Sequence, residues 1–285
     1  MSRRSQCTVR RPAVVTGVGY WSGAECRVEI LPAPAGAGVV FVRGDRDVPV
    51  RIAATVENRV DGPLRTTLAS AGVRVEMVEH VLSALAGLGV DCCTVRVTAG
   101  EMPGLDGSAL GFVEAIEAVG IEALGAPAEP LVVESSVRVG DGDAWVEASP
   151  PRHAGLSIEY ELDYGAGPIG RQTLALHVTP DRYRAELAAA RTFVTEVEAE
   201  RLRGAGLGRH VTRHDLLVFG ADGPLDNSLR WADECVRHKV LDLVGDLALV
   251  GRPLHAHVRA RRSGHRLNAA LAARLAALEG RRASA

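Results

Sequence analysis

Several features that mark common functional classes are missing from this sequence of 285 residues. Positive charge is not in excess, because 33 Lys and Arg are balanced by 35 Asp and Glu, so we expect no nucleic-acid partner. No apolar run approaches the ~20 residues that cross a bilayer, and no apolar segment follows the basic residues 1–11 as it does in a signal peptide. We therefore expect a soluble, cytoplasmic protein without a transmembrane segment.

Common metal-binding and cofactor-binding motifs are missing as well. The chain has five cysteines but no C-x-x-C pair and no H-E-x-x-H, so the signatures of zinc proteases and nucleobase deaminases are absent. Scattered thiols in a long globular chain favour a reducing compartment. The glycines of residues 17–23 are followed by no helix, which favours a hairpin turn over a dinucleotide-binding loop. Side-chain periodicity is therefore the main guide to a site.

Residues 231–250 predict an amphipathic helix. Four apolar residues recur on one face at helical spacing, namely Val236, Val240, Leu243 and Leu247. The opposite face carries His238, Asp242 and Asp246, each one turn after the last. An i, i+4 pair lies about 5–6 Å apart at Cβ, close enough to share one metal ion. For an isolated His–Asp pair on a helix, a solvated polar face is the commoner explanation. Here Gly245 beside His238 and the absence of a Lys/Glu run on this face favour a metal site.

A second helix is predicted over residues 78–89, with Gly89 at its end. Its apolar residues recur at helical spacing and its other side carries no charge, so we expect it to be packed on most sides. Glu79 and His80 therefore lie at the start of a largely buried helix, where an unpaired ionisable group is costly. Two interpretations remain open for this pair: a hydrogen-bonded core histidine, or a water-activating base beside a metal ligand.

The ends of the two halves of the chain follow the same order of elements. Each has a helix that carries the candidate His in its first half, then a strand, a Gly/Ser turn and a further helix. Residues 125–130 have the composition of a linker, so we place one domain at residues 1–126 and a second at 127–285. A duplicated unit would bring the two helix starts to one cleft and supply His80 as a third ligand, although chance could also produce this agreement.

Other helices are expected in the second half. Residues 181–191 predict one helix, and residues 195–203 predict another, opened by a capping box between Thr195 and Glu198. We expect Asn227 or Ser228 to cap the helix of residues 231–250.

We expect His80, His238 and Asp242 to bind one zinc ion, since three protein ligands and one open position are typical of a catalytic zinc site. Glu79 is the candidate base for a water molecule, and His265 is the candidate acid, held charged and oriented by Asp246.

Two other histidine pairs are weaker candidates. His255 and His257 share the face of an Arg-rich strand, which repels a cation, and His210 and His214 lie in a predicted solvated loop.

Five stretches together resemble the zinc-dependent UDP-3-O-acyl-N-acetylglucosamine deacetylases of lipid A synthesis: residues 78–91, 105–109, 190–193, 236–246 and 262–268. The resemblance implies an α+β fold of two similar domains, each a β-sheet with helices. The domains would pack as a sheet–helices–sheet sandwich with the active site between them. It also implies a segment at about residues 193–222, inserted in the second domain, that guides an acyl chain.

The same resemblance implies roles for individual residues. His80, His238 and Asp242 would be the zinc ligands, with Glu79 as general base and His265, backed by Asp246, as general acid. Thr192 would polarise the acetyl carbonyl group or hold the oxyanion. Phe193 would contact the substrate, and Lys239 would meet its charged part. We expect a monomer.

The implied reaction is hydrolysis of the N-acetyl group of UDP-3-O-(3-hydroxyacyl)-N-acetylglucosamine, which yields the free amine and acetate. The sequence departs from the family pattern at residues 19–23 (Gly-Tyr-Trp-Ser-Gly for Gly-Leu-His-Ser-Gly), at Ala144 and at residues 209–214. A related deacetylase for another N-acetylated sugar nucleotide or glycan is therefore the alternative. A non-catalytic metal scaffold is a third, for which Glu79 and His265 would be superfluous. The sequence does not determine the length of the acyl chain or whether the native metal is zinc or iron.

Overall fold

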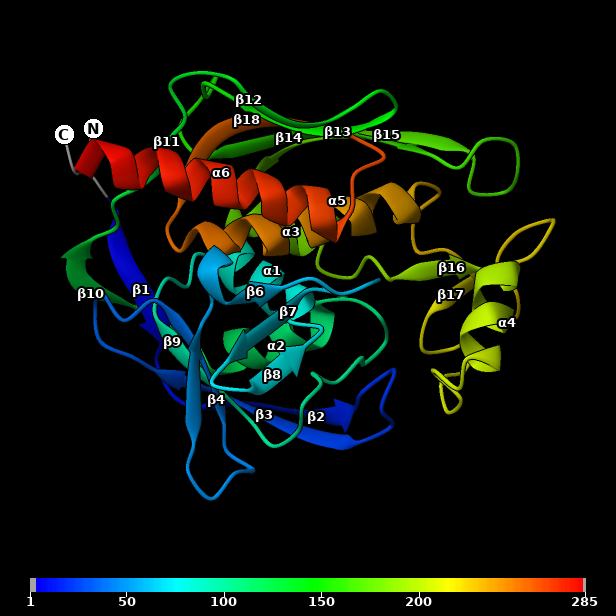
Figure 1. Cartoon of the computed structure of the whole chain (residues 1–285), viewed down its shortest axis with the longest axis horizontal. Coiled ribbons are helices and arrows are strands. Elements are labelled where there is room, and N and C mark those ends of the chain that lie inside the picture. Colours follow the sequence, from blue (N-terminus) through cyan, green and yellow to red (C-terminus); the bar gives the residue numbers. More distant parts are fainter. Residues whose placement is uncertain (1–3, 284–285) are drawn as a thin grey trace.

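Two β-sheets enclose a layer of helices (Figure 1). The computed structural model describes the backbone of residues 4–283 and the side chains of residues 4–278. The first sheet has five strands, in the order β2 (Ala13–Val18), β3 (Glu25–Pro32), β9 (Cys93–Val97), β4 (Val39–Arg43) and β5 (Val50–Ala53). The main path of the second is β12 (Val137–Asp141), β13 (Ala144–Ser149), β18 (Leu254–Arg261), β14 (Leu156–Asp163) and β15 (Arg171–Val178). A short sixth strand, β11 (Leu131–Val132), pairs with β18.

The two sheets share one topology. In each, a hairpin (β2–β3 or β12–β13) pairs with a late strand (β9 or β18), which in turn pairs in parallel with β4 or β14. Helices α1 (Glu79–Leu88) and α2 (Leu110–Val119) flank β9 in the chain, as α5 (Glu234–Leu247) and α6 (His265–Ala283) flank β18. This agreement confirms the predicted internal repeat, whereas a domain boundary at residues 126/127 stays a prediction.

The helices form the middle layer because each has an apolar face for a sheet or for another helix. Helix α5 packs on β14 and β15, α6 packs on β12 and β13, and α2 packs on β2. Helices α1 and α5 pack directly against each other between the sheets (Figure 1). The predicted α+β class, with helices between two sheets, is confirmed.

Smaller elements complete the fold. Strands β6 (Arg59–Val60), β7 (Thr67–Ser70) and β8 (Val73–Glu76) form a three-stranded sheet, and β1 (Ser5–Val9) pairs with β10 (Ile121–Pro127). The short helices are η1 (Val56–Asn58), α3 (Pro180–Glu186) and η2 (Ala248–Val250). Within the described residues, no helix is both long enough and apolar enough to span a bilayer.

The segment that the sequence marks as an insert has structure of its own. Strand β16 (Phe193–Thr195), helix α4 (Glu196–Gly204) and strand β17 (Leu217–Phe219) follow one another and project from the body of the protein (Figure 1). The capping box predicted between Thr195 and Glu198 opens α4. Strands β16 and β17 pair in parallel, so the chain returns beside its starting point.

Two predicted helix ends are wrong. Helix α3 ends at Glu186 rather than Arg191, and α5 begins at Glu234 without a side-chain cap from Asn227 or Ser228. The reason is a buried guanidinium group. Arg191 donates to the Asn227 amide oxygen and to the Ser228 carbonyl, and these contacts hold both segments in non-helical conformations.

Candidate metal centre and active site

Helices α1 and α5 bring the candidate residues together. The Ser83 hydroxyl on α1 donates to the Leu241 carbonyl on α5 at 2.7 Å, and the Glu79 backbone lies against Gly245. The earlier residue of α1, Glu79, lies against the later residue of α5, Gly245, so the two helices are antiparallel. The start of α1 consequently lies beside the polar face of α5, and the residues His238, Asp242 and Asp246 of that face are buried.

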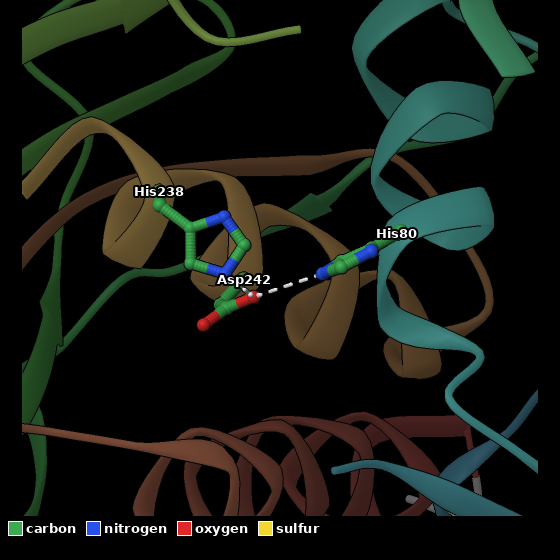
Figure 2. A group of neighbouring side chains, drawn as sticks. All are labelled: His80, His238 and Asp242. Carbon is green, nitrogen blue, oxygen red and sulfur yellow. Dashed lines mark ion pairs between the residues drawn. The ribbon is translucent and has the colours of Figure 1, made fainter. Parts of the chain in front are cut away.

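Three donor atoms converge there (Figure 2). His80 Nε2 lies 3.8 Å and His238 Nε2 3.3 Å from the same oxygen, Asp242 Oδ1. All three donor atoms lie within 4.8 Å of one another, and the three residues are buried. Among the residues whose side chains are described, no second group of this kind exists. The sequence predicted these three residues as ligands, and the fold places them side by side.

The donor set fits a metal ion. Asp242 Oδ1 is buried and has no hydrogen-bond partner, although such an atom normally has one. His238 Nδ1 lies 3.0 Å from the Ala190 carbonyl, which can only accept, so that nitrogen carries the proton and Nε2 keeps its lone pair. Two imidazoles and a carboxylate are donors typical of zinc.

The local electrostatics favour neutral imidazoles beside an ionised carboxylate. Burial, and then the neighbouring His238, lower the pKa of His80 to about 3. Burial also lowers the pKa of His238. Burial by itself raises the pKa of Asp242, but the opposing effects of His238, Lys239 and His265 outweigh it and lower the pKa below its ordinary value. All three side chains therefore present lone pairs at neutral pH.

Two ionisable groups flank the cluster with opposite pKa shifts. Burial raises the pKa of Glu79 to about 7, against the opposing effect of His265. Burial by itself lowers the pKa of His265, but the carboxylates of Asp246 and Asp242 outweigh it and raise the pKa to about 9. Glu79 Oε1 and His265 Nε2 lie 4.0 Å apart. Near pH 8 the pair therefore holds a base and an acid at once.

Asp246 lies behind His265, as the sequence predicted. Its Oδ2 atom accepts from His265 Nδ1 at 2.9 Å and from the Asn268 amide at 2.9 Å. Its Oδ1 atom accepts from the hydroxyl of Thr66 at 2.5 Å. The carboxylate is completely buried, so each of these bonds is shielded from competition with water.

The remaining predicted site residues also line this centre. The backbone of Thr192 is held between Gly107 and Leu217, which leaves its side chain at the cavity wall. Phe193 lies with its ring 6.4 Å from the His238 ring. The ammonium group of Lys239 binds Asp242 Oδ2 at 2.7 Å, and its expected contact with the substrate stays a prediction. Burial lowers the pKa of Lys239, but Asp242 outweighs it and raises the pKa above its ordinary value, so the group stays charged.

A cavity of about 690 Å³ opens from the cluster. The insert supplies an apolar wall to it, made of Val194, Ala199, Leu202, Leu207, Val211 and Val218. Four arginines also line it: Arg201, Arg203, Arg262 and Arg266. The stretches at which the sequence departs from the family pattern, residues 19–23, 144 and 209–214, contribute Tyr20, Trp21, Ala144, Val211 and Thr212 to the lining of the same cavity. It can therefore hold a ligand with an apolar chain and an anionic part.

Sequence reasoning missed several residues of the site. Thr66 and Asn268 bind Asp246, and the Ala190 carbonyl orients His238. The buried Glu234 binds the Arg191 guanidinium group through both carboxylate oxygens, at 2.8 and 3.0 Å. Thr66 carries no signal in the sequence, because any threonine could serve, and the Ala190 carbonyl lies in a stretch that resembles the family but is a backbone group that no residue type marks. Asn268 lies within a stretch that resembles the family, which was a usable signal.

The family model of UDP-3-O-acyl N-acetylglycosamine deacetylase (LpxC) matches residues 6–277. The chain belongs to this family. It is 41% identical over 273 residues to UDP-3-O-acyl-N-acetylglucosamine deacetylase of Solibacter usitatus, covering 95% of this chain and 91% of the relative. The enzyme of the same name from Myxococcus xanthus is 40% identical, covering 94% of this chain and 85% of the relative. That of Brucella ovis is 38% identical, covering 92% of each. The predicted family is confirmed, and it is a family of metalloenzymes.

Proposed function

We propose that this chain is a zinc amidase that removes the acetyl group from the 2-amino group of a UDP-linked, 3-O-acylated glucosamine. The observation that carries this proposal is the buried three-donor cluster with one unpartnered carboxylate oxygen, flanked by Glu79 and His265 at the edge of a largely apolar cavity. The relatives' names support the same substrate. The family acts in lipid A synthesis, so the product would enter that synthesis.

We propose His80, His238 and Asp242 as the residues that hold the metal ion. When bound, zinc supplies a Lewis acid that polarises a carbonyl group and lowers the pKa of water. Two histidines and one carboxylate with an open position also bind iron(II), so the resemblance to a zinc-dependent family, and not the donor set, favours zinc. All three ligands come from one chain, which supports a monomer as the functional unit.

The chain's own residues account for the proton transfers. Glu79, with a pKa of about 7, takes a proton from the attacking water molecule. His265, with a pKa of about 9 and held by Asp246, gives a proton to the leaving amine. The hydroxyl of Thr192 donates to the carbonyl oxygen as negative charge develops on it. Amide hydrolysis needs such an acid, because an amide anion is a poor leaving group.

Substrate groups can be matched to the cavity walls. The apolar wall of the insert, residues 193–222, suits the 3-O-acyl chain, and Phe193 lies where this wall meets the metal centre. The arginines of the cavity suit the diphosphate, since a guanidinium group binds phosphate oxygens through paired hydrogen bonds. Lys239, which stays charged, would meet a polar substrate group close to the metal centre. We propose that residues 1–126 and 127–285 are the domains whose cleft contains these groups.

One experiment tests the reaction and the substrate together. Metal content and acetate release are measured with UDP-3-O-acyl-N-acetylglucosamine and, as the control, with UDP-N-acetylglucosamine. We expect about one zinc per chain and acetate release at least about tenfold faster from the acylated substrate, a factor that corresponds to about 1.4 kcal/mol of acyl-chain binding. Metal-loaded protein that releases no acetate from the acylated substrate would refute the proposal.

The alternative is a related deacetylase for a different N-acetylated sugar nucleotide or glycan. One observation favours testing it: Tyr20, Trp21 and Ala144, which depart from the family pattern, all line the cavity. Equal acetate release from the unacylated sugar nucleotide would favour this alternative.

A further inference from the structure

A completely buried threonine joins the two proton-transfer residues. Thr66 lies directly before β7, and its backbone N–H donates to Glu79 Oε2 at 3.0 Å. Its hydroxyl donates to Asp246 Oδ1 at 2.5 Å, across 180 residues of sequence, and the hydroxyl oxygen itself, Thr66 Oγ1, lies 3.3 Å from His265 Nδ1. The carbonyl of Thr66 accepts from the Val78 N–H at 3.3 Å, which ties the residue to the start of α1.

These contacts constrain both carboxylates. With Oε2 of Glu79 bound to Thr66, the other oxygen, Oε1, faces His265. With Oδ1 of Asp246 bound to Thr66, Oδ2 faces His265 Nδ1 and Asn268. Thr66 does not line the cavity, so it is not placed to touch a substrate.

We propose that Thr66 is a positioning residue that sets the base and the acid relative to each other through one side chain and one backbone N–H. This inference rests on the proposed function, since it assigns Thr66 a part in proton transfer by Glu79 and His265. A carboxylate that can turn loses alignment with its partner, and small misalignments reduce turnover strongly. The competing explanation is that the hydroxyl only satisfies a buried carboxylate and contributes to folding alone.

Three substitutions separate these explanations. T66V removes the hydroxyl and keeps the volume, T66A removes it without adding a methyl group, and T66S retains it. T67V is the matched control: Thr67 is the next residue and is also buried, but the hydrogen bonds to Glu79 and Asp246 are made by Thr66. All four proteins are compared with the unsubstituted chain in kcat, KM, metal content and thermal midpoint, under the assay described above.

We expect T66V and T66A to lower kcat by about 10–100-fold, the usual effect of losing an outer hydrogen-bond partner. KM and metal content should stay within about twofold in both variants, T66S should recover most of kcat, and T67V should keep it. Either T66V or T66A suffices if the other fails to fold. The proposal is overturned if a folded, metal-loaded T66V or T66A turns over at the full rate, or if T66S is as impaired as they are.

A second readout does not depend on turnover. A His265 Nδ1–H proton bound to Asp246 gives a far-downfield ¹H NMR signal, which can be assigned by its loss in H265A. We expect this signal in the unsubstituted chain, T66S and T67V, and a shifted or exchange-broadened signal in T66V. An unchanged signal in T66V would contradict the positioning role even if the chain proved to act on another substrate. If the chain releases no acetate but its NMR signal changes in T66V, only the proposed substrate is refuted and the positioning role stands.

Discussion

Gly245 of α5 lies so close to Glu79 of α1 that a Cβ atom at residue 245 would be 2.1 Å from the Glu79 carbonyl oxygen. Only a residue without a Cβ atom permits this approach, because contacts below 3.0 Å require the backbone of α1 to move. The approach brings the first turn of α1, with Glu79 and His80, against the polar face of α5. The glycine thus sets the distance on which the three-donor cluster depends.

We therefore expect Gly245→Ala to destabilise the fold and to weaken metal binding. Alanine is favoured over glycine within a helix by about 1 kcal/mol, but displacing a packed helix costs about 1–3 kcal/mol or more. Gly204→Ala is the control, since nothing lies within 4 Å of its Cβ position. Urea unfolding and chelator competition measure the two effects. Unchanged stability and metal affinity in Gly245→Ala would contradict the close contact.

Loss of a ligand should remove the metal without unfolding the protein. We expect His80→Ala to reduce bound zinc to below about a tenth of the chain concentration, because two ligands seldom retain the ion. His255→Ala, on a strand remote from the cluster, should keep full metal content. Metal analysis after dialysis against a weak chelator makes the comparison, and full zinc occupancy in His80→Ala would mean that another residue completes the site.

The two flanking groups predict the pH dependence of kcat/KM. The proposed mechanism requires ionised Glu79 and protonated His265, so activity should rise as pH passes the Glu79 pKa of about 7 and fall as pH passes the His265 pKa of about 9. A bound cation lowers both values, since positive charge disfavours protonation, so each limb should lie at or below these figures. A profile without a falling limb up to pH 10 would show that His265 is not the acid.

Removal of the base should abolish turnover but leave the metal bound. Glu79→Gln keeps the shape of the side chain and cannot accept a proton, so kcat should fall by about 10²–10⁴-fold. Metal content should stay near one per chain, because Glu79 is outside the donor set. Full activity in Glu79→Gln, measured as acetate release, would assign the role of base to another group.

The buried ion pair between Arg191 and Glu234 should contribute strongly to stability. Both side chains are almost inaccessible to solvent, so Glu234→Gln leaves a buried guanidinium charge uncompensated, at a cost of about 3–5 kcal/mol. Arg152→Gln removes the guanidinium group from an exposed pair with Glu159 and should cost at most about 1 kcal/mol. Urea unfolding of the two variants tests the difference, and equal effects would rule out a special contribution from burial.

The sequence by itself determined the parts of the site that are local in the chain. An α-helix places residues i and i+4 on one face, so His238 and Asp242 had to be neighbours once residues 234–247 were helical. The absence of charge around residues 78–89 indicated that Glu79 and His80 would be buried, and both are. The repeated order of elements, together with the family resemblance, then indicated that His80 would meet the other two ligands.

Only the tertiary structure decided the contacts that no local spacing encodes. The helix ends at Glu186 and Glu234 depend on where the Arg191 guanidinium group finds its partners, and propensity carries no information about a partner that is far away in the chain. Thr66 reaches Asp246, and the Ala190 carbonyl reaches His238, because packing brings their segments together. Hydrogen bonds within a helix link residues a few positions apart, whereas these bonds form only after the two sheets have enclosed the helices between them.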